Sequence, residues 1–357
     1  MVLPSSMIVP LLNSRESRKV VRLVVVINCD SITGIRLTLP QSNGYESETR
    51  PVKDNSLAAL RDRQSNPIYR WGIRPIPIDP KDHLGSGQLV EIEHGRVHVE
   101  SVGDGPDILA LPSFAGTART WRATAEHLKQ NYRLHLLDFL GYGLSDKPSG
   151  IDHSRIGQAH QIQQAMDAIG LKQCVLMSSS ASAASSLYAQ FRTPRRICAN
   201  IMVAPFVSPT KIAKTGLRIL RLPFAKQILQ TLLGFRPVVF MANYTGRSDR
   251  SGITPAIVDD QFLTFGTPGI WDSLGEIGKH LAPSALNGIV QMNTIPTLVV
   301  WGSEDRAGDL IGTRRLLGQI PEMQFEIFDP CGHVIQEERP AELASTICRF
   351  LGEHSVK

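Results

Sequence analysis

Hydrophobic and polar residues follow a regular order only from Leu89 to the C-terminus. Residues 89–103, LVEIEHGRVHVESVG, alternate apolar and polar positions on both sides of His94-Gly95, which predicts a β-hairpin. Short stretches that are rich in apolar residues come next, and each of them predicts a strand. These runs lie at Asp107–Pro112, Arg133–Phe139, Cys174–Met177 and Ile197–Ala204.

Amphipathic segments separate the predicted strands. Apolar residues recur at the spacing of one helix face around residues 156–169, which predicts a helix there. Strands that alternate with helices in this way favour a mostly parallel sheet covered by helices on both faces. We therefore predict an α/β fold.

The alternation stops after Pro205. The following stretch has helical character interrupted by prolines and no strand–helix unit, which predicts an inserted helical cap near residues 206–292. Two further apolar runs then predict strands at Thr297–Gly302 and Met323–Phe328. A last helix is predicted from Pro340, because proline is favourable in the first turn of a helix.

The first 88 residues lack this order. Residues 41–87 are polar and rich in Pro, Asn and Ser, so residues 1–88 are predicted to form a largely irregular or disordered extension. The apolar run Val20–Cys29 is too short to span a bilayer, and an extra strand is one interpretation of it. Nearby Arg and Ser residues weakly resemble an organellar transit peptide, while Glu16 and Asp30 count against one. We expect a cytoplasmic protein, with targeting to a plastid or mitochondrion through this extension as the alternative.

The composition excludes several classes of protein. Of the 357 residues 42% are hydrophobic and 20% are charged, which is enough apolar material for a sizeable core. The net charge of +5 is modest, and no dense Lys/Arg block is interleaved with aromatic residues. We therefore expect no nucleic-acid partner and no transmembrane segment, and leave the oligomeric state open.

The cysteines exclude a disulfide framework. They are odd in number and widely spaced, with no CxxC pair, which is typical of reduced thiols and not of a zinc site. They are Cys29, Cys174, Cys198, Cys331 and Cys348. We predict neither a metal nor an organic cofactor.

Residues Cys174–Ser186, CVLMSSSASAASS, hold the most informative pattern. An apolar run stops abruptly in small residues, and a segment that can open a helix follows at once. A strand that turns sharply into a helix strains its turn residue and needs small residues two positions before and after it. Ser180 meets this demand, with Ser178 and Ser182 at the two small positions. Ser182 also satisfies the size rule and stays the alternative, although it lengthens the strand by two residues.

Partners for such a serine occur downstream. A serine hydroxyl becomes a nucleophile when a histidine, itself oriented by a carboxylate, takes its proton. Asp305 in WGSEDRAG and His333 in DPCGHVIQEERP each follow a predicted strand, where open α/β sheets place their functional groups. The chain order Ser180, Asp305, His333 is nucleophile, acid, base, as in an α/β-hydrolase. Taken singly, Asp305 could equally cap a loop or helix, and His333 could be a surface histidine.

From Leu89 onward the chain resembles the α/β-hydrolase superfamily, in the group with a helical cap. Similar segments follow in the family's order: the oxyanion loop LPSFAGTARTW, the fourth-strand loop DFLGYGLSDKP, the elbow VLMSSSAS, the acid loop VVWGSEDR and the histidine loop CGHVIQEERPAEL. The resemblance implies a single hydrolase domain over residues 89–357 that works through a covalent acyl-enzyme. It also implies that the backbone N–H groups of Phe114 and Ala181 form the oxyanion hole.

Two features depart from the family pattern. Pro112-Ser113 stand where His-Gly is usual in the oxyanion loop, and serine replaces both elbow glycines, at Ser178 and Ser182. Neither proposed oxyanion donor depends on the identity of a side chain. We therefore expect an altered loop and a tighter elbow, with the site retained.

Together these features predict a serine hydrolase, most simply a carboxylic ester hydrolase, that cleaves an ester or similar acyl bond of a small apolar substrate. A C–C bond or lactone hydrolase with the same triad is one alternative. A protein that keeps the fold and binds a ligand without catalysis is the other.

Overall fold

The computed structural model describes residues 7–10, 22–28, 31–38, 75–222, 224–281 and 286–354. The chain divides into two compact units, Met1–Asn66 and Pro67–Lys357. In the first unit the described residues form an antiparallel sheet of three strands. They are β1 (Met7–Pro10), β2 (Arg22–Asn28) and β3 (Ser31–Thr38), paired in that order.

Strand β2 coincides with the apolar run at residues 20–29. The irregular segment expected at residues 41–74 lies outside the described residues. The boundary between extension and hydrolase domain at residues 88 and 89, and any targeting role of the extension, stay predictions.

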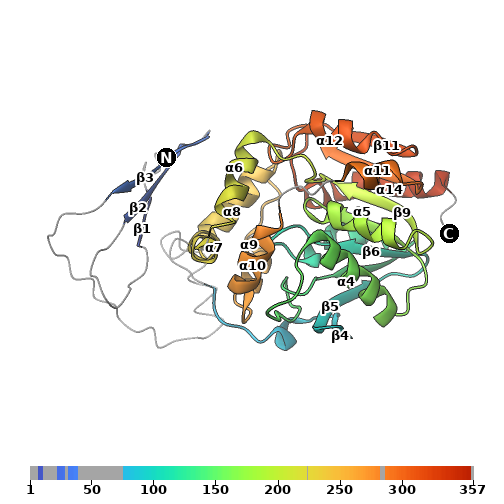
Figure 1. Cartoon of the computed structure of the whole chain (residues 1–357), viewed down its shortest axis with the longest axis horizontal. Helices are drawn as coiled ribbons and strands as arrows, with labels where there is room; N and C mark the ends of the chain where they lie inside the picture. The colour runs from blue at the N-terminus through green and yellow to red at the C-terminus, as the bar shows by residue number, and fades with distance from the viewer. Residues whose placement is uncertain are drawn as a thin grey trace. The chain divides into compact units, whose positions relative to one another are not determined.

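An eight-stranded sheet forms the centre of the second unit (Figure 1). Its strands are β4 (Gln88–Ile92), β5 (Gly95–Val102), β6 (Asp107–Leu111), β7 (Arg133–Leu137), β8 (Cys174–Ser179), β9 (Ile197–Val203), β10 (Thr297–Gly302) and β11 (Met323–Phe328). They lie in the order β11-β10-β9-β8-β6-β7-β5-β4. The pairings β4–β5 and β5–β7 are antiparallel and the others are parallel. The predicted hairpin and the predicted mostly parallel α/β sheet are both confirmed.

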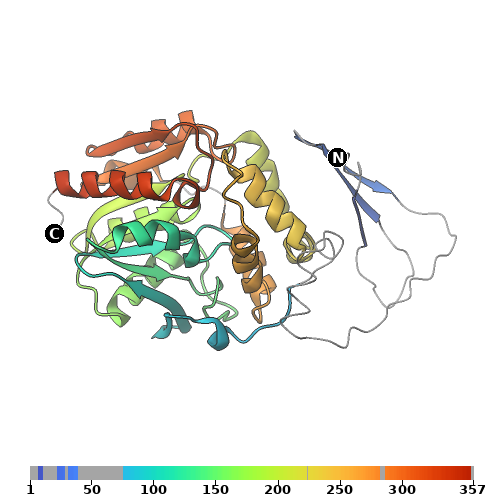
Figure 2. The same ribbon diagram turned by 180° about the vertical axis from the view of Figure 1, so that it is seen from behind.

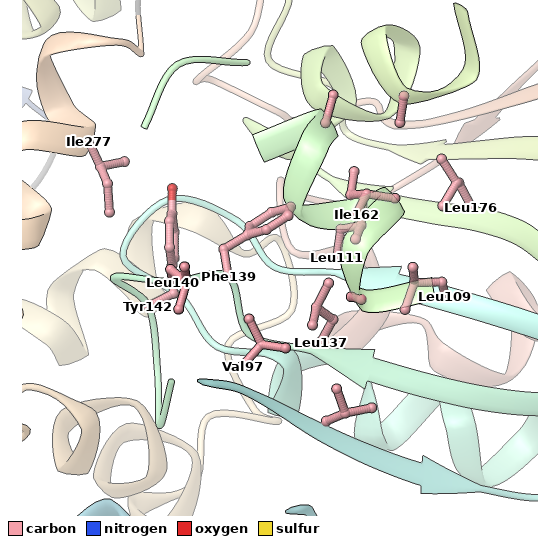
Figure 3. Close-up of a cluster of buried hydrophobic side chains, with 14 of the residues drawn as sticks. Val97, Leu109, Leu111, Leu137, Phe139, Leu140, Tyr142, Ile162, Leu176 and Ile277 are labelled. Carbon is pink, nitrogen blue, oxygen red and sulfur yellow. The ribbon is translucent and has the colours of Figure 1, made fainter. Parts of the chain in front are cut away.

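The central strands are mostly apolar and buried because both faces of the sheet are covered. Successive side chains of a strand point to opposite faces. Leu109 of β6 and Leu176 of β8 pack in one core (Figure 3), whereas Ile108 and Met177 of the same strands pack in a second core. A one-residue shift in register would exchange the two sets.

Helices on both sides complete these cores. Figure 1 shows α4 and α5 in front of the sheet, and the view from behind in Figure 2 shows α14 on the other face. The helices outside the insertion are η1 (Pro80–His83), η2 (Ala118–Trp121), α3 (Arg122–Leu128), α4 (Arg155–Ala168), α5 (Ser182–Arg192), α12 (Leu310–Leu317), α13 (Ile335–Glu338) and α14 (Pro340–Glu353). The predicted helices at 156–169 and from Pro340 correspond to α4 and α14.

Between β9 and β10 the chain forms the predicted run of helices, here called the insertion. It comprises α6 (Lys211–Ile219), α7 (Ala225–Leu233), α8 (Arg236–Gly246), α9 (Pro255–Thr264), α10 (Ile270–Lys279) and α11 (Asn287–Gln291). Helices α6 to α10 gather at one end of the sheet (Figures 1 and 2). Ile277 of α10 belongs to the same core as Leu140 and Tyr142 (Figure 3), so part of the insertion is anchored by apolar packing.

The described residues contain no bilayer-spanning helix, no metal-binding cluster of side chains and no disulfide. None of the helices there has the length and apolar character needed to cross a bilayer. No cluster of three or more His, Cys, Asp or Glu side chains in the same residues is placed to hold a metal ion. The four cysteines in the described part of the chain, which exclude Cys29, are all free thiols.

Candidate active site

Ser180 occupies the sharp turn between β8 and α5. Its φ is +55°, in the left-handed region that residues with a side chain rarely adopt. The turn is held by backbone bonds on both sides: the Ser180 N–H donates to the Val203 carbonyl at 2.9 Å, and its carbonyl accepts from the Phe206 N–H at 2.9 Å. The neighbouring strand β9 and its exit therefore fix the strained conformation that the sequence predicts for an elbow.

The two serines that replace the elbow glycines are buried and hydrogen-bonded. The Ser178 hydroxyl donates to the Ile201 carbonyl and lies 3.3 Å from the Ser186 hydroxyl. The Ser182 hydroxyl donates to the Ser179 carbonyl at 2.9 Å and accepts from the Ser179 N–H at 3.1 Å. Each added hydroxyl thus has a partner within the elbow.

Three residues far apart in the sequence meet at this turn. His333 Nε2 lies 2.9 Å from Ser180 Oγ, and His333 Nδ1 lies 2.7 Å from Asp305 Oδ2. A carboxylate can only accept, so Nδ1 carries the proton and Nε2 is left to accept the Ser180 hydroxyl proton. The structure therefore brings together Ser180, His333 and Asp305, and not Ser182.

The Asp305 side chain is held in place by backbone N–H groups of the residues that follow it. Asp305 follows β10, and its side chain is fully buried. Its Oδ1 accepts N–H groups from Ala307 at 2.8 Å and Gly308 at 3.4 Å, which leaves Oδ2 directed at the histidine. His333 lies in the loop between β11 and α13, and its ring is 21% exposed. The Asp305 carboxylate is thus shielded, while the His333 ring can be reached from solvent.

The two predicted oxyanion donors lie on the segments that flank Ser180. Ala181 is the residue before α5, and Phe114 follows β6 in a turn closed by a 3.1 Å bond from the Gly116 N–H to the Ser113 carbonyl. Ala115 in this turn has a φ of +55°. Within the described chain, the N–H groups of Phe114 and Ala181 donate to no protein acceptor. Both amides are therefore free to donate to a substrate.

Sequence reasoning missed a polar contact beneath the elbow. Gln336 Nε2 of α13 donates to the Ser179 hydroxyl at 3.3 Å and to the Thr120 hydroxyl at 3.0 Å. It joins the histidine side of the site to both the elbow and η2. A glutamine three residues after a histidine carries no signal in the sequence that would have indicated this role.

Sequence reasoning also missed a second Asp–His pair. Asp138 directly follows β7, and its Oδ2 lies 3.0 Å from His98 Nδ1 of β5, with both side chains essentially inaccessible. Burial acts to raise the pKa of Asp138, but bonds from His98 and from the N–H groups of Ala118 and Leu144 outweigh it and lower that pKa. The Asp138 carboxylate therefore holds together the segments that carry His98, Ala118 and Leu144.

A cleft of about 740 Å³ is lined by sequence neighbours of the site residues, and not by Ser180, His333 or Asp305 themselves. Ser113 and Gly116 of the Phe114 turn line it, as does Val334, the neighbour of His333. The opposite wall comes from the insertion, through residues such as Asn243 of α8 and Leu263 of α9. Any molecule in this cleft touches segments that carry site residues on one side and the insertion on the other.

The sheet order, the strained elbow and the Ser–His–Asp contacts define the α/β-hydrolase class. The chain belongs to the alpha/beta hydrolase family, whose model matches residues 108–346. The family predicted from the sequence is thus confirmed.

Curated relatives are distant in sequence. The chain is 25% identical over 263 residues to a 2-hydroxy-6-oxononadienedioate/2-hydroxy-6-oxononatrienedioate hydrolase of Comamonas testosteroni, which covers 68% of this chain and 86% of that protein. It is 24% identical over 264 residues to a monoacylglycerol lipase of Mus musculus, covering 70% and 76% respectively. Hydrolases acting on different bonds are therefore about equally similar to this chain.

Solved structures agree with the fold. A meta-cleavage product hydrolase from Pseudomonas fluorescens IP01 superposes with a TM-score of 0.64 at 19% identity, over 76% of this chain and 99% of that one. A thermophilic esterase from Thermogutta terrifontis superposes with a TM-score of 0.63 at 17% identity, over 75% and 98%. At such identities the likeness establishes the fold alone.

Proposed function

We propose that this protein is a serine hydrolase that cleaves an ester or similar acyl bond of a small apolar substrate. The observation that carries the proposal is the continuous contact from Ser180 Oγ through the His333 ring to Asp305. Histidine between a hydroxyl and a carboxylate is the arrangement that activates serine. The insertion would act as the cap over the bound substrate.

In this mechanism His333 Nε2 takes the Ser180 proton as Oγ attacks the acyl carbonyl. The N–H groups of Phe114 and Ala181 stabilise the oxyanion that develops. His333 then gives its proton to the leaving group, and an acyl group stays on Ser180. Water, deprotonated by His333, cleaves this acyl-enzyme and restores the free serine.

The lining of the cleft supports an apolar substrate portion. Ala242, Ile257, Leu263 and Val334 contribute apolar surface. The charged side chains in the same lining include Arg119 and Asp260, which form an ion pair with each other. Charges paired in this way leave the apolar surface as the main source of binding free energy.

A second candidate, a C–C bond or lactone hydrolase, uses the same triad. It is favoured by the 25% identity to the Comamonas testosteroni hydrolase, which is close to the 24% identity to the monoacylglycerol lipase. Turnover separates the two candidates: an ester hydrolase cleaves p-nitrophenyl acyl esters faster than a chromogenic 2-hydroxy-6-oxo-dienoate, and a C–C hydrolase reverses that order.

The activated serine is tested with a fluorescent fluorophosphonate and peptide mapping of the adduct. We expect wild-type protein to be labelled on Ser180. We expect Ser180→Ala and His333→Ala to lose labelling by a factor on the order of 10⁴ or more. Ser182→Ala is the matched control and should still be labelled.

Two results would contradict this assignment. An adduct on Ser182 would show that Ser182, two residues further along the chain, is the nucleophile in place of Ser180. A folded wild-type protein that takes no label would favour a ligand-binding role on the same fold.

A further inference from the structure

The histidine loop, residues 329–334, is packed against the end of helix α8 in the insertion. The His333 N–H donates to the Gly246 carbonyl, the last residue of α8, at 2.7 Å. A Cβ atom added at Gly332 would lie 2.3 Å from that same carbonyl oxygen and 2.7 Å from Cα of Arg247. Only glycine allows so close an approach, so this contact between the two backbones requires glycine at position 332.

The other side of the loop rests on the exit of β10. The Glu304 N–H donates to the Cys331 carbonyl at 2.9 Å, and a Cβ atom at Gly302 would lie 2.0 Å from the Gly332 carbonyl oxygen. The loop is therefore held between the strand that supplies Asp305 and the helix end that belongs to the insertion. Because the loop is packed tightly on both sides, a displacement of α8 would also displace His333.

Glu338 of α13 fastens the two segments together. One carboxylate oxygen accepts the Gly332 N–H at 3.1 Å, and the other accepts the Asp249 N–H at 3.0 Å. The Ser248 N–H lies 3.2 and 3.1 Å from the two oxygens. One side chain thus takes three backbone donors, one from the histidine loop and two from the chain leaving α8.

Cys331 in the same loop is no competing nucleophile. Burial, followed by the nearby negative charge of Glu338, raises the pKa of its thiol to about 12. The thiol stays protonated at neutral pH. Its contribution to this region is therefore packing.

The neighbouring acid strengthens the same junction. Glu337 forms a buried ion pair with Arg247, whose side chain is 1% exposed, and also accepts from the Thr120 hydroxyl. Arg247 in turn reaches the Asn243 side chain of α8. Two consecutive acids of α13 therefore bind the end of α8. Glu337 does so through the Arg247 side chain, and Glu338 does so through the backbone N–H groups of Ser248 and Asp249.

We propose that Glu338 is a positioning residue that clamps the histidine loop to the end of α8 and so holds His333 between Ser180 and Asp305. The proposal rests on the assignment of His333 as the base. Misplacing a reacting group by about 1 Å costs on the order of 100-fold in rate. Because α8 also lines the cleft, occupation of the cleft and placement of the base are mechanically coupled through this clamp.

The test compares Glu338→Gln and Glu338→Leu with wild type. Glutamine keeps one acceptor oxygen and leucine keeps none, so we expect Ser180 labelling to slow by about 10-fold and about 100-fold in turn. Labelling is resolved into a maximal rate and a half-saturating probe concentration, and the rate should change much more than the concentration. Glu326→Gln is the matched control, because Glu326 is a paired surface acid on β11, and it should behave as wild type.

A spectroscopic measurement separates positioning from simple loss of stability. In wild type the Nδ1 proton between His333 and Asp305 should give a strongly downfield ¹H resonance, assigned by its loss in Asp305→Asn. We expect this resonance to shift or broaden in folded Glu338→Gln and to stay in place in Glu326→Gln.

Each outcome decides a different point. A Glu338→Gln protein with reduced thermal stability but an unchanged labelling rate and resonance would overturn the clamp. If wild type takes no label, the proposed function fails, while the resonance still tests whether Glu338 positions His333. An unmoved resonance in that case would overturn the clamp as well.

Discussion

Two Asp–His pairs lie where parallel strands of this sheet end at their carboxyl side, and in only one of these two pairs does the second ring nitrogen of the histidine reach a serine hydroxyl. Asp305 follows β10 and meets His333 at 2.7 Å, and Asp138 follows β7 and meets His98 at 3.0 Å. Both acids use Oδ2 for the histidine, and both also accept two backbone N–H groups. The local chemistry of the two pairs is nearly the same.

Their difference lies in the second nitrogen of each ring. Nε2 of His333 reaches Ser180 at 2.9 Å. Nε2 of His98 is buried without a hydrogen-bond partner in the described residues, and a Cβ atom at Gly87 would lie 2.3 Å from it. An Asp–His contact is therefore not a catalytic signature by itself. A serine on the second nitrogen does not suffice either, because His135 lies 2.9 Å from Asp107 and 2.8 Å from the Ser101 hydroxyl, and Asp107 begins β6, away from the elbow.

Exposure adds to this contrast. The His333 ring is 21% exposed, whereas His98 and Asp138 are 0% and 1% exposed. A base must meet substrate and exchange protons, whereas a buried pair that orders a loop gains from exclusion of water. The exposure of the His333 ring is what the proposed catalysis requires, and the burial of the His98–Asp138 pair is what a stabilising role requires.

The largest effect is expected from matched amide substitutions of the two acids. Asp305→Asn should slow Ser180 labelling by about 10⁴-fold, because the amide disfavours the required histidine tautomer and no longer stabilises the imidazolium. Asp138→Asn should instead lower the free energy of unfolding by about 3–5 kcal/mol, since it breaks a buried pair. Labelling rates of folded protein and denaturant unfolding curves measure the two effects. Equal losses of rate in both variants would erase the distinction.

The next prediction concerns how the stability that Asp138 provides changes at low pH. The pKa of Asp138 is lower in the folded chain than its ordinary value of 3.8, so the unfolded chain binds more protons in acid. Its contribution is fully present well above pH 3.8 and is lost as the pH falls through the folded value. The stability gap between wild type and Asp138→Asn should therefore shrink between pH 5 and pH 3, roughly the range over which the unfolded carboxyl protonates. A gap that is constant over this range would show that the charge of Asp138 is not its source.

The smallest effect is expected at the elbow. Ser182→Ala removes the hydroxyl that bonds both the Ser179 N–H and the Ser179 carbonyl, which should cost about 1–2 kcal/mol of stability. Ser180 keeps its bonds to Val203 and Phe206, so the labelling rate should stay near that of wild type. Thermal unfolding and labelling measured side by side check this. A large loss of rate with no loss of stability would give Ser182 a part in the chemistry.

Much of the fold could be predicted because it depends on neighbouring residues. Period-2 and period-3.6 patterns come from the geometry of one strand or one helix, so the hairpin at 89–103 and the later strands could be located from them. The elbow at Ser180 could be located for the same reason, since a sharp turn restricts the size of residues two positions away. The alternation of these elements then indicated the class of fold.

The partners of buried polar side chains could not be predicted in this way. Glu338 lies in a run of acids before Pro340 that is ordinary in the first turns of a helix, and its contacts with residues 248 and 249 span about ninety positions of the chain. His98 lies on β5 and Asp138 directly follows β7, and only the pairing of these two strands places them together. The hydroxyl of Ser182 gave no sign that its partner would be the backbone of Ser179.

The sequence by itself determined the class of fold, located the strained serine and named His333 and Asp305 as its expected partners. The tertiary structure alone decided the contact distances among Ser180, His333 and Asp305, and which acids hold the loop of His333 in place. The physical reason is the range of the forces involved. Steric and periodic constraints act between residues that are close in the sequence, so they can be read from local patterns. Hydrogen bonds between loops depend on the order and register of the strands, which no local pattern reveals.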